Sequence, residues 1–143
     1  MRTVAHILQS KPIQTTLTIS PDATVLKALT LMADKGVGAL IVTENDKLVG
    51  IISERDYARK VALMERSSSD TLVTDIMTHK VLTVERRNTV EECLKLMTDR
   101  HLRHLPVVEN EVLIGMVSIG DLVKGMIEQQ QELIDQLQNY IAN

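Results

Sequence analysis

Residues 17–57 read LTISPDATVLKALTLMADKGVGALIVTENDKLVGIISERDY, and residues 82–122 read LTVERRNTVEECLKLMTDRHLRHLPVVENEVLIGMVSIGDL. The second stretch lies 65 positions after the first and aligns with it without a gap. Identical residues recur along the whole alignment: Leu17, Thr24, Met32, Leu40, Gly50, Ser53 and Asp56 return as Leu82, Thr89, Met97, Leu105, Gly115, Ser118 and Asp121. The duplication predicts two similar units that pack around a pseudo-twofold axis, with a cleft between them that presents the same polar groups twice.

Each copy predicts the element order strand, helix, strand, strand, helix. The spacing of apolar residues gives strands at residues 17–19, 39–42 and 48–52 and then at 81–84, 105–108 and 112–117, with helices at 24–35, after 53, at 89–100 and from about 119. Thr24 is suited to cap the start of its helix and Gly36 to end it. The continuous apolar run at 39–42 is typical of a strand buried on both faces. An α/β fold with small sheets flanked by helices follows.

Two segments lie outside the aligned copies. Residues 4–7 (VAHI) resemble residues 73–76 (VTDI), which indicates a short leading segment before each copy. The tail from Lys124 has apolar residues every seven positions and predicts an amphipathic helix of about five turns. This helix either packs on its own domain or forms a subunit contact. We therefore divide the chain into residues 1–66 (first repeat with an N-terminal helix), 67–125 (second repeat) and 126–143 (C-terminal helix), with both repeats in one module.

Composition excludes several classes of function. The 143 residues carry a net charge of −3, whereas nucleic-acid binding needs a basic surface. The apolar runs are too short to span a membrane, and the N-terminus lacks a secretory core, so a cytoplasmic location is expected. The one cysteine, Cys93, has the spacing of a buried core residue. His101 and His104 lack a third convergent ligand, so we expect no metal site.

The pattern Gly-x-x-Ser-x-x-Asp occurs at Gly50 and again at Gly115. We expect the glycine to open the last strand of each copy, the serine to lie where strand becomes helix, and the aspartate to follow in the first helical turn. Ser followed three residues later by an acid is close to a capping box, which would need no ligand. The alternative is a nucleoside phosphate, with the phosphate at the helix start and the ribose diol on the aspartate.

The doubled pattern, together with Gly36-Val37-Gly38-Ala39-Leu40 and Arg103-His104-Leu105-Pro106-Val107 on the middle strands, resembles a tandem pair of cystathionine-β-synthase (CBS) domains, also called a Bateman module. The resemblance covers about residues 3 to 125. It implies two pseudo-symmetric β-α-β-β-α repeats packed sheet to sheet, which commonly pair into a homodimer.

The resemblance also implies ligands and their contacts. Such modules commonly bind AMP, ADP, ATP, NAD or S-adenosylmethionine. The positions that the family uses correspond here to Asp56 and Asp121 for the ribose, Ser53 and Ser118 as hydroxyls, Thr15, Thr16, Lys80 and Val81 beside the base, and Gly38, Ala39, His104, Leu105 and Pro106 along the pocket.

The two expected clefts differ in charge. Arg55 follows Ser53, while the second copy has Ile119-Gly120 in the equivalent place. The second copy instead has Arg103 and His104 on its middle strand. A phosphate held by either arginine would gain bidentate, charge-assisted hydrogen bonds. We therefore expect unequal affinities at the two clefts, or a longer ligand such as NAD.

These observations favour a stand-alone regulatory module that senses AMP, ATP or NAD and acts on a partner protein, with no enzymatic activity and no catalytic residue. One alternative is a structural scaffold with empty clefts, in which Ser and Asp only cap helices. A less favoured alternative is a small nucleotide hydrolase, although neither serine is followed by a histidine that could activate it.

Overall fold

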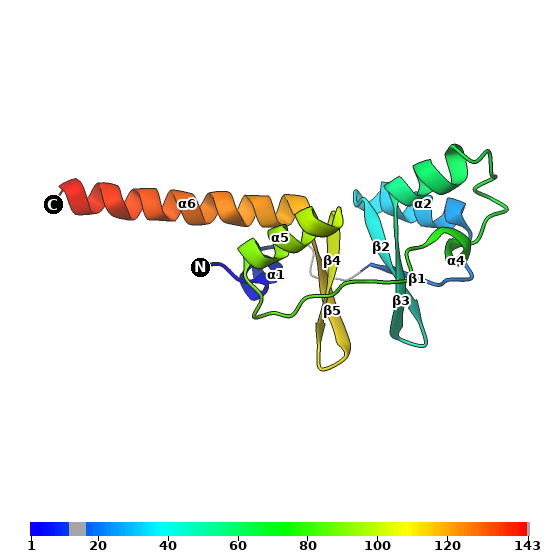
Figure 1. Cartoon of the computed structure of the whole chain (residues 1–143), viewed down its shortest axis with the longest axis horizontal. Coiled ribbons are helices and arrows are strands. Elements are labelled where there is room, and N and C mark those ends of the chain that lie inside the picture. Colours follow the sequence, from blue (N-terminus) through cyan, green and yellow to red (C-terminus); the bar gives the residue numbers. More distant parts are fainter. Residues whose placement is uncertain (12–16, 143) are drawn as a thin grey trace. The chain divides into compact units, whose positions relative to one another are not determined.

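The computed structural model describes residues 1–11 and 17–142 (Figure 1). The chain divides into two compact units. We call Thr16–Leu82 the central unit, and Met1–Thr15 together with Thr83–Asn143 the terminal unit. Within the described residues, none of the helices combines the length and the apolar character that crossing a bilayer requires.

The central unit is built on a sheet with strand order β1-β2-β3. Its elements are β1 (Thr18–Ile19), α2 (Val25–Lys35), β2 (Ala39–Glu44), β3 (Lys47–Ser53), α3 (Glu54–Tyr57), the π-helical turn η1 (Ala58–Ala62) and α4 (Val73–Ile76). The start of β2, residues 39–42, is completely buried, as its apolar run predicts. Thr24 caps α2 and Gly36 ends it in a left-handed conformation, which confirms both predicted helix ends.

The terminal unit repeats this arrangement around a smaller sheet, β4-β5. It contains α1 (Val4–Ser10), α5 (Val90–Arg100), β4 (His104–Glu109), β5 (Val112–Ser118) and α6 (Ile119–Ala142). Cys93 on α5 is fully buried in the apolar core of this unit. The two hairpins β2-β3 and β4-β5 have the same register, since Ser53 pairs with Ala39 and Ser118 pairs with His104.

The predicted strand at residues 81–84 is wrong, because only a single bridge between Val84 and Val107 forms there. The equivalent strand in the central unit uses the Ile41 N–H, which donates to the Leu17 carbonyl. Pro106 occupies the position of Ile41 in the second repeat and has no N–H. One substitution therefore shortens the ladder and reduces the strand to a bridge.

The leading helices are exchanged between the repeats. In the central unit, the Val73 N–H at the start of α4 donates to the Ala23 carbonyl at 2.8 Å. In the terminal unit, the Val4 N–H at the start of α1 donates to the Asn88 carbonyl at 2.8 Å. Val4 and Val73 are both fully buried. The compact units therefore do not coincide with the sequence division into residues 1–66 and 67–125.

The recurring glycine lies in the middle of its strand and not at the start, so that part of the motif prediction is wrong. A Cβ on Gly50 would lie 2.6 Å from the Met77 Sδ atom and 2.9 Å from the Thr78 carbonyl oxygen. A Cβ on Gly115 would lie 2.9 Å from Leu8 Cδ2. Glycine recurs because a residue of the exchanged leading segment rests on the strand backbone at this point.

The tail is not a separate element. Residues 126–143 were expected to form a helix of their own, but α6 runs without interruption from Ile119 to Ala142. The helix that closes the second repeat therefore continues outward as the tail. Its first turns supply Leu122 and Gly125 to the buried part of the terminal unit.

Replacing Gly50 with alanine is expected to destabilise the protein by about 1–3 kcal/mol, because the methyl group must displace Met77 and a backbone carbonyl. Urea denaturation measures the loss. Gly120→Ala is the matched control, since its Cβ would meet only Ser118 Oγ at 3.7 Å. Equal stability of the two variants would contradict this account of the motif.

Candidate functional site at the two strand–helix junctions

At the central junction, β3 becomes α3 through a reciprocal pair of hydrogen bonds. The Asp56 N–H donates to Ser53 Oγ at 3.2 Å, and the Ser53 N–H donates to Asp56 Oδ2 at 2.9 Å. The Ser53 hydroxyl also donates to Asp56 Oδ2 at 3.0 Å. These hydrogen bonds form the capping box that the sequence predicts. Asp56 is also one of the two aspartates expected to bind a ribose.

A lysine neutralises this aspartate. Lys60 Nζ lies 3.2 Å from Asp56 Oδ1 and also donates to the Ile76 carbonyl at 2.8 Å. The Asp56 side chain is only 14% exposed, so the cation compensates a largely buried carboxylate. The described contacts of Asp56 thus engage both of its oxygens.

The terminal junction has the same capping box with a different lysine. The Ser118 N–H donates to Asp121 Oδ2 at 2.9 Å, and the Asp121 N–H donates to Ser118 Oγ at 3.1 Å. Lys11 Nζ lies 3.0 Å from the same Oδ2 atom and donates to the Met116 carbonyl at 2.8 Å. This cation comes from the exchanged leading segment, whereas Lys60 lies one turn after its aspartate.

Charges at the terminal junction change two pKa values. Burial would raise the pKa of Asp121, but the hydrogen bond from the Ser118 N–H and the Lys11 ammonium outweigh it, so the pKa lies below its ordinary value. Burial lowers the pKa of His104; the Asp121 carboxylate opposes this shift, and Lys11 and Arg103 reinforce it. The junction therefore holds an ionised carboxylate beside a histidine that favours its neutral form.

The helix starts offer less to an anion than the sequence indicated. The Glu54 N–H donates to the Gly38 carbonyl at 3.1 Å, and the Ile119 N–H donates to the Arg103 carbonyl at 2.9 Å. The serine hydroxyls accept from a further N–H group in each helix. Since these contacts use two of the first three N–H groups of each helix, a phosphate would depend more on side chains than the sequence indicated.

The family model described as CBS domain matches this chain twice, at residues 4–63 and 73–128. The chain belongs to the CBS-domain family. This confirms the family and the fold class predicted from the duplicated sequence.

Individual relatives agree with this assignment. A mitochondrial CBS domain-containing protein of Arabidopsis thaliana is 44% identical over 125 residues, which make up 84% of this chain and 61% of the plant protein. The chain thus spans less than two thirds of that relative's length. The structure of a CBS-domain protein from Burkholderia ambifaria MC40-6 has a TM-score of 0.87 at 52% identity and covers 90% of this chain and 96% of that chain. A CBS domain pair in complex with 5′-methylthioadenosine and S-adenosyl-L-methionine has a TM-score of 0.77 at 24% identity and covers 90% of this chain and 98% of that chain.

The structure brings some of the predicted site residues of each CBS repeat together. Ala39 lies opposite Ser53, and His104 lies opposite Ser118, so each middle strand borders its junction. Pro106, two residues further along β4, is buried and pairs with Met116.

The other predicted site residues either take no part in these two strand pairs or lie outside the residues that the structure describes. Arg55 is partly exposed and Arg103 is exposed. Lys80 and Val81 come from the second CBS repeat but belong to the central unit, with Ser53. Thr15 and Thr16 lie outside the described residues.

Neither lysine was predicted from the sequence as a site residue. Lys60 follows Asp56 by four positions, a spacing at which opposite charges meet on a helix, so this pair was detectable. Lys11 is 110 positions from Asp121, and only the exchange of the leading helices brings it to the second CBS repeat. No local pattern could have revealed that contact.

Replacing Lys11 with methionine is expected to reduce stability by about 1 kcal/mol at neutral pH, because it leaves a partly buried carboxylate without its cation. The depressed folded-state pKa of Asp121 means that its stabilising contribution is present above the unfolded-state pKa and is lost as pH falls through the folded-state value. The difference between wild type and variant should therefore shrink in acid.

Chemical denaturation across pH, together with the Asp121 pKa from NMR titration, measures both effects. Lys95→Met is the matched control, since the Lys95–Asp99 pair is 3.7 Å long and both side chains are mostly exposed. An unchanged Asp121 pKa in Lys11→Met would refute the pairing.

Proposed function

We propose that this CBS-domain protein is a regulatory module that binds an adenine nucleotide, AMP, ATP or NAD, at its strand–helix junctions. The bound state would be passed through a homodimer to a partner protein, in the cytoplasm. The module would not be an enzyme, since the serines act as helix caps and the nucleotide would leave unchanged. The observation that carries the proposal is the carboxylate–lysine pair that recurs at both junctions on unrelated stretches of chain.

A ribose diol fits these carboxylates chemically. A carboxylate offers about four acceptor sites, and hydroxyl groups donate well to an ionised acid. The described contacts of Asp121 both end on Oδ2, from Ser118 and Lys11, so its other oxygen faces fewer competitors. The lysine beside each aspartate is a cation close to the place where the nucleotide phosphates would follow the ribose. The adenosine-containing ligands named for a CBS domain pair of the same fold support this class of ligand.

Signalling requires the nucleotide to favour one arrangement of the chain over another. In the structure, each lysine bonds an aspartate and a backbone carbonyl. A nucleotide that draws the lysine to its phosphate would break both contacts at once. Ligand binding is therefore coupled to the segments that carry these carbonyls, Ile76 at the end of α4 and Met116 in β5.

A structural scaffold is the second candidate, because the capping boxes alone explain the recurrence of Ser and Asp. In that case the junctions would stabilise helices and bind nothing. A nucleotide hydrolase is the remaining alternative and requires turnover of ATP or NAD by the pure protein. Ligand-dependent melting and nucleotide turnover separate these possibilities.

A saturating adenine nucleotide is expected to raise the melting temperature. At a hundredfold excess over its Kd, a ligand adds about 2.7 kcal/mol, or about 5–10 °C for a domain of this size. Asp56→Asn and Asp121→Asn should each reduce the shift, because the amide accepts fewer hydrogen bonds from a ribose. Asp75→Asn is the matched control, since Asp75 accepts from a helix-start N–H at 3.3 Å but lies outside both junctions.

The absence of any shift with AMP, ADP, ATP, NAD and S-adenosylmethionine would favour the scaffold. Release of ADP or nicotinamide from the mixture, lost in either aspartate variant, would favour the hydrolase. Mass spectrometry of ligand released from freshly purified, denatured protein identifies the nucleotide directly.

The two junctions are expected to bind with different affinities. Arg55 adds a cation only at the central junction, and Arg103 with His104 adds charge and bulk only at the terminal one. Calorimetry should resolve two unequal sites, or a single site for a dinucleotide. Arg55→Leu should weaken one phase and leave the other unchanged. Two identical affinities would contradict the asymmetry.

A further inference from the structure

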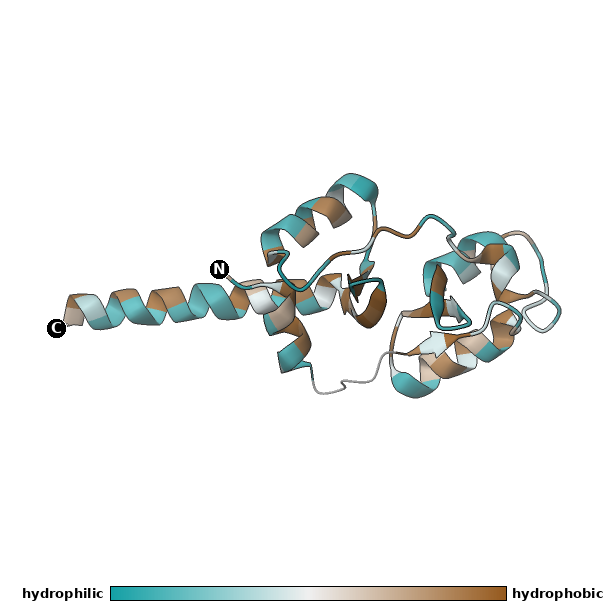
Figure 2. Cartoon of the chain, turned by 90° about the horizontal axis from the view of Figure 1, so that it is seen from below, coloured by the Kyte–Doolittle hydropathy of each residue, from teal (hydrophilic) through white to brown (hydrophobic). Residues whose placement is uncertain are grey.

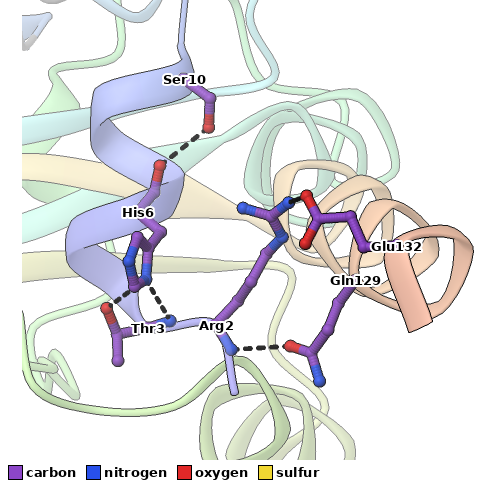
Figure 3. A network of polar contacts seen from close by, with 6 residues as sticks. All are labelled: Arg2, Thr3, His6, Ser10, Gln129 and Glu132. Atoms are coloured by element: carbon purple, nitrogen blue, oxygen red, sulfur yellow. Dashed lines mark hydrogen bonds and ion pairs between the residues drawn. The ribbon is translucent and has the colours of Figure 1, made fainter. Parts of the chain in front are cut away.

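One side of α6 is fixed to the terminal unit. Gly125 is buried so tightly that a Cβ there would lie 2.3 Å from Ile7 Cδ1 of α1. The Arg2 N–H donates to Gln129 Oε1 at 2.6 Å, and Arg2 Nη2 bonds Glu132 Oε1 at 2.5 Å (Figure 3). These contacts set the rotation of the helix about its own axis. They also end at Glu132, so the last turns extend past them.

A different side of α6 carries an exposed apolar stripe. Figure 2 shows hydrophobic (brown) and hydrophilic (teal) segments alternating along this helix. The stripe consists of Val123, Ile127, Gln130, Ile134, Leu137 and Ile141. Its spacing alternates between four and three residues, the a/d repeat of a coiled coil. The five apolar members are 42–81% exposed. At 100° per residue, the stripe lies roughly 130° around the axis from the residues that contact the terminal unit.

The distribution of charge along α6 permits pairing with a second copy of the same helix. The acidic residues of α6, Asp121, Glu128, Glu132 and Asp135, all lie off the stripe. The stripe itself carries no charge, and its flanking e positions are Lys124, Gln131 and Gln138. Two copies can therefore meet along it without acid facing acid, although the chain as a whole is acidic. A strongly charged partner helix would find little complementary charge there.

We infer that two copies of this chain pair through the α6 stripe as a short, parallel, two-stranded coiled coil. Ile127, Ile134 and Ile141 occupy a positions and Leu137 a d position, the choice that favours two strands. In parallel register Gln130 faces its own copy, so the two amides can bond each other. In antiparallel pairing Gln130 would face Ile134 and leave its amide buried without a partner.

The pairing also explains how the last turns of α6, which are exposed in the single chain, are stabilised. All of residues 130–142 are exposed in the single chain. Isolated helices of this length are marginal in water, and most helical stability comes from packing an apolar face. The inference names the contact of the homodimer invoked above, but it does not depend on nucleotide binding.

Cysteine cross-linking of the full chain tests the pairing and its direction. In a parallel pair, the two Leu137 positions lie within disulfide range, whereas antiparallel pairing separates them by roughly 15 Å. Leu137→Cys should therefore cross-link under mild oxidation at least fivefold more than Asp135→Cys, the control on the outer face. Native Cys93 adds little background, because it is buried and burial raises the pKa of its thiol to about 11. Equal cross-linking, or none in Leu137→Cys, would overturn the proposal.

Sedimentation equilibrium gives an independent measurement. Ile134→Asp should weaken the dimer at least tenfold, since it places acids opposite each other on the stripe, while Gln136→Asp adds the same charge off the stripe and should not. Both positions are exposed, and circular dichroism checks that each variant folds. A dimer unaffected by Ile134→Asp would show that the contact lies elsewhere. Nucleotide-induced melting shifts in the same variants report on the proposed function separately, because neither junction is altered.

Discussion

The close contact between each leading segment and the last strand of the other repeat determines which repeat each leading helix packs on. Met77 rests on Gly50, and Leu8 rests on Gly115, at distances that leave no room for a side chain. This contact places α4 in the central unit and α1 in the terminal unit. It thereby brings the Ile76 carbonyl to Lys60, and Lys11 to Asp121. The cation beside Asp121 and the second contact of Lys60 are therefore consequences of an apolar exchange.

Most of the fold could be predicted because it depends on local rules applied twice. Thr24 and Thr89 cap the starts of their helices, and Gly36 ends one, through contacts with neighbouring residues. The apolar run at 39–42 forms a buried strand, as such runs commonly do. The strand predicted at 81–84 was wrong because these residues resemble 17–19, where a strand does form. Pro106 on the neighbouring strand lacks the N–H that would bond it, and this loss is evident only once the pairing of the strands is known. A proline in one strand can thus prevent a distant segment from forming the strand beside it.

The site was less accessible to sequence reasoning than the fold. Ser53 and Asp56 form the box that their spacing predicts, yet the same contacts use the N–H groups that were expected to hold a phosphate. The partner of Asp56 lies four residues away and could have been predicted, whereas Lys11 reaches Asp121 only through the exchange. The exchange of leading segments between repeats leaves no periodic pattern in the sequence. Contacts that depend on it, such as Lys11 with Asp121, are therefore found only in the three-dimensional structure.

The different origins of the two lysines give the junctions different consequences. Lys60 and Asp56 belong to one short helical stretch, so breaking their pair disturbs mainly that stretch and the end of α4. Lys11 joins the leading segment to the first turn of α6, and α1 also packs against Gly125 of that helix. A ligand that displaced Lys11 would break its contact with Asp121, at the base of the helix that carries the apolar stripe, and its contact with the Met116 carbonyl in β5. The terminal junction is therefore the one that links ligand occupancy to the tail, because its cation follows α1 directly and bonds the first turn of α6.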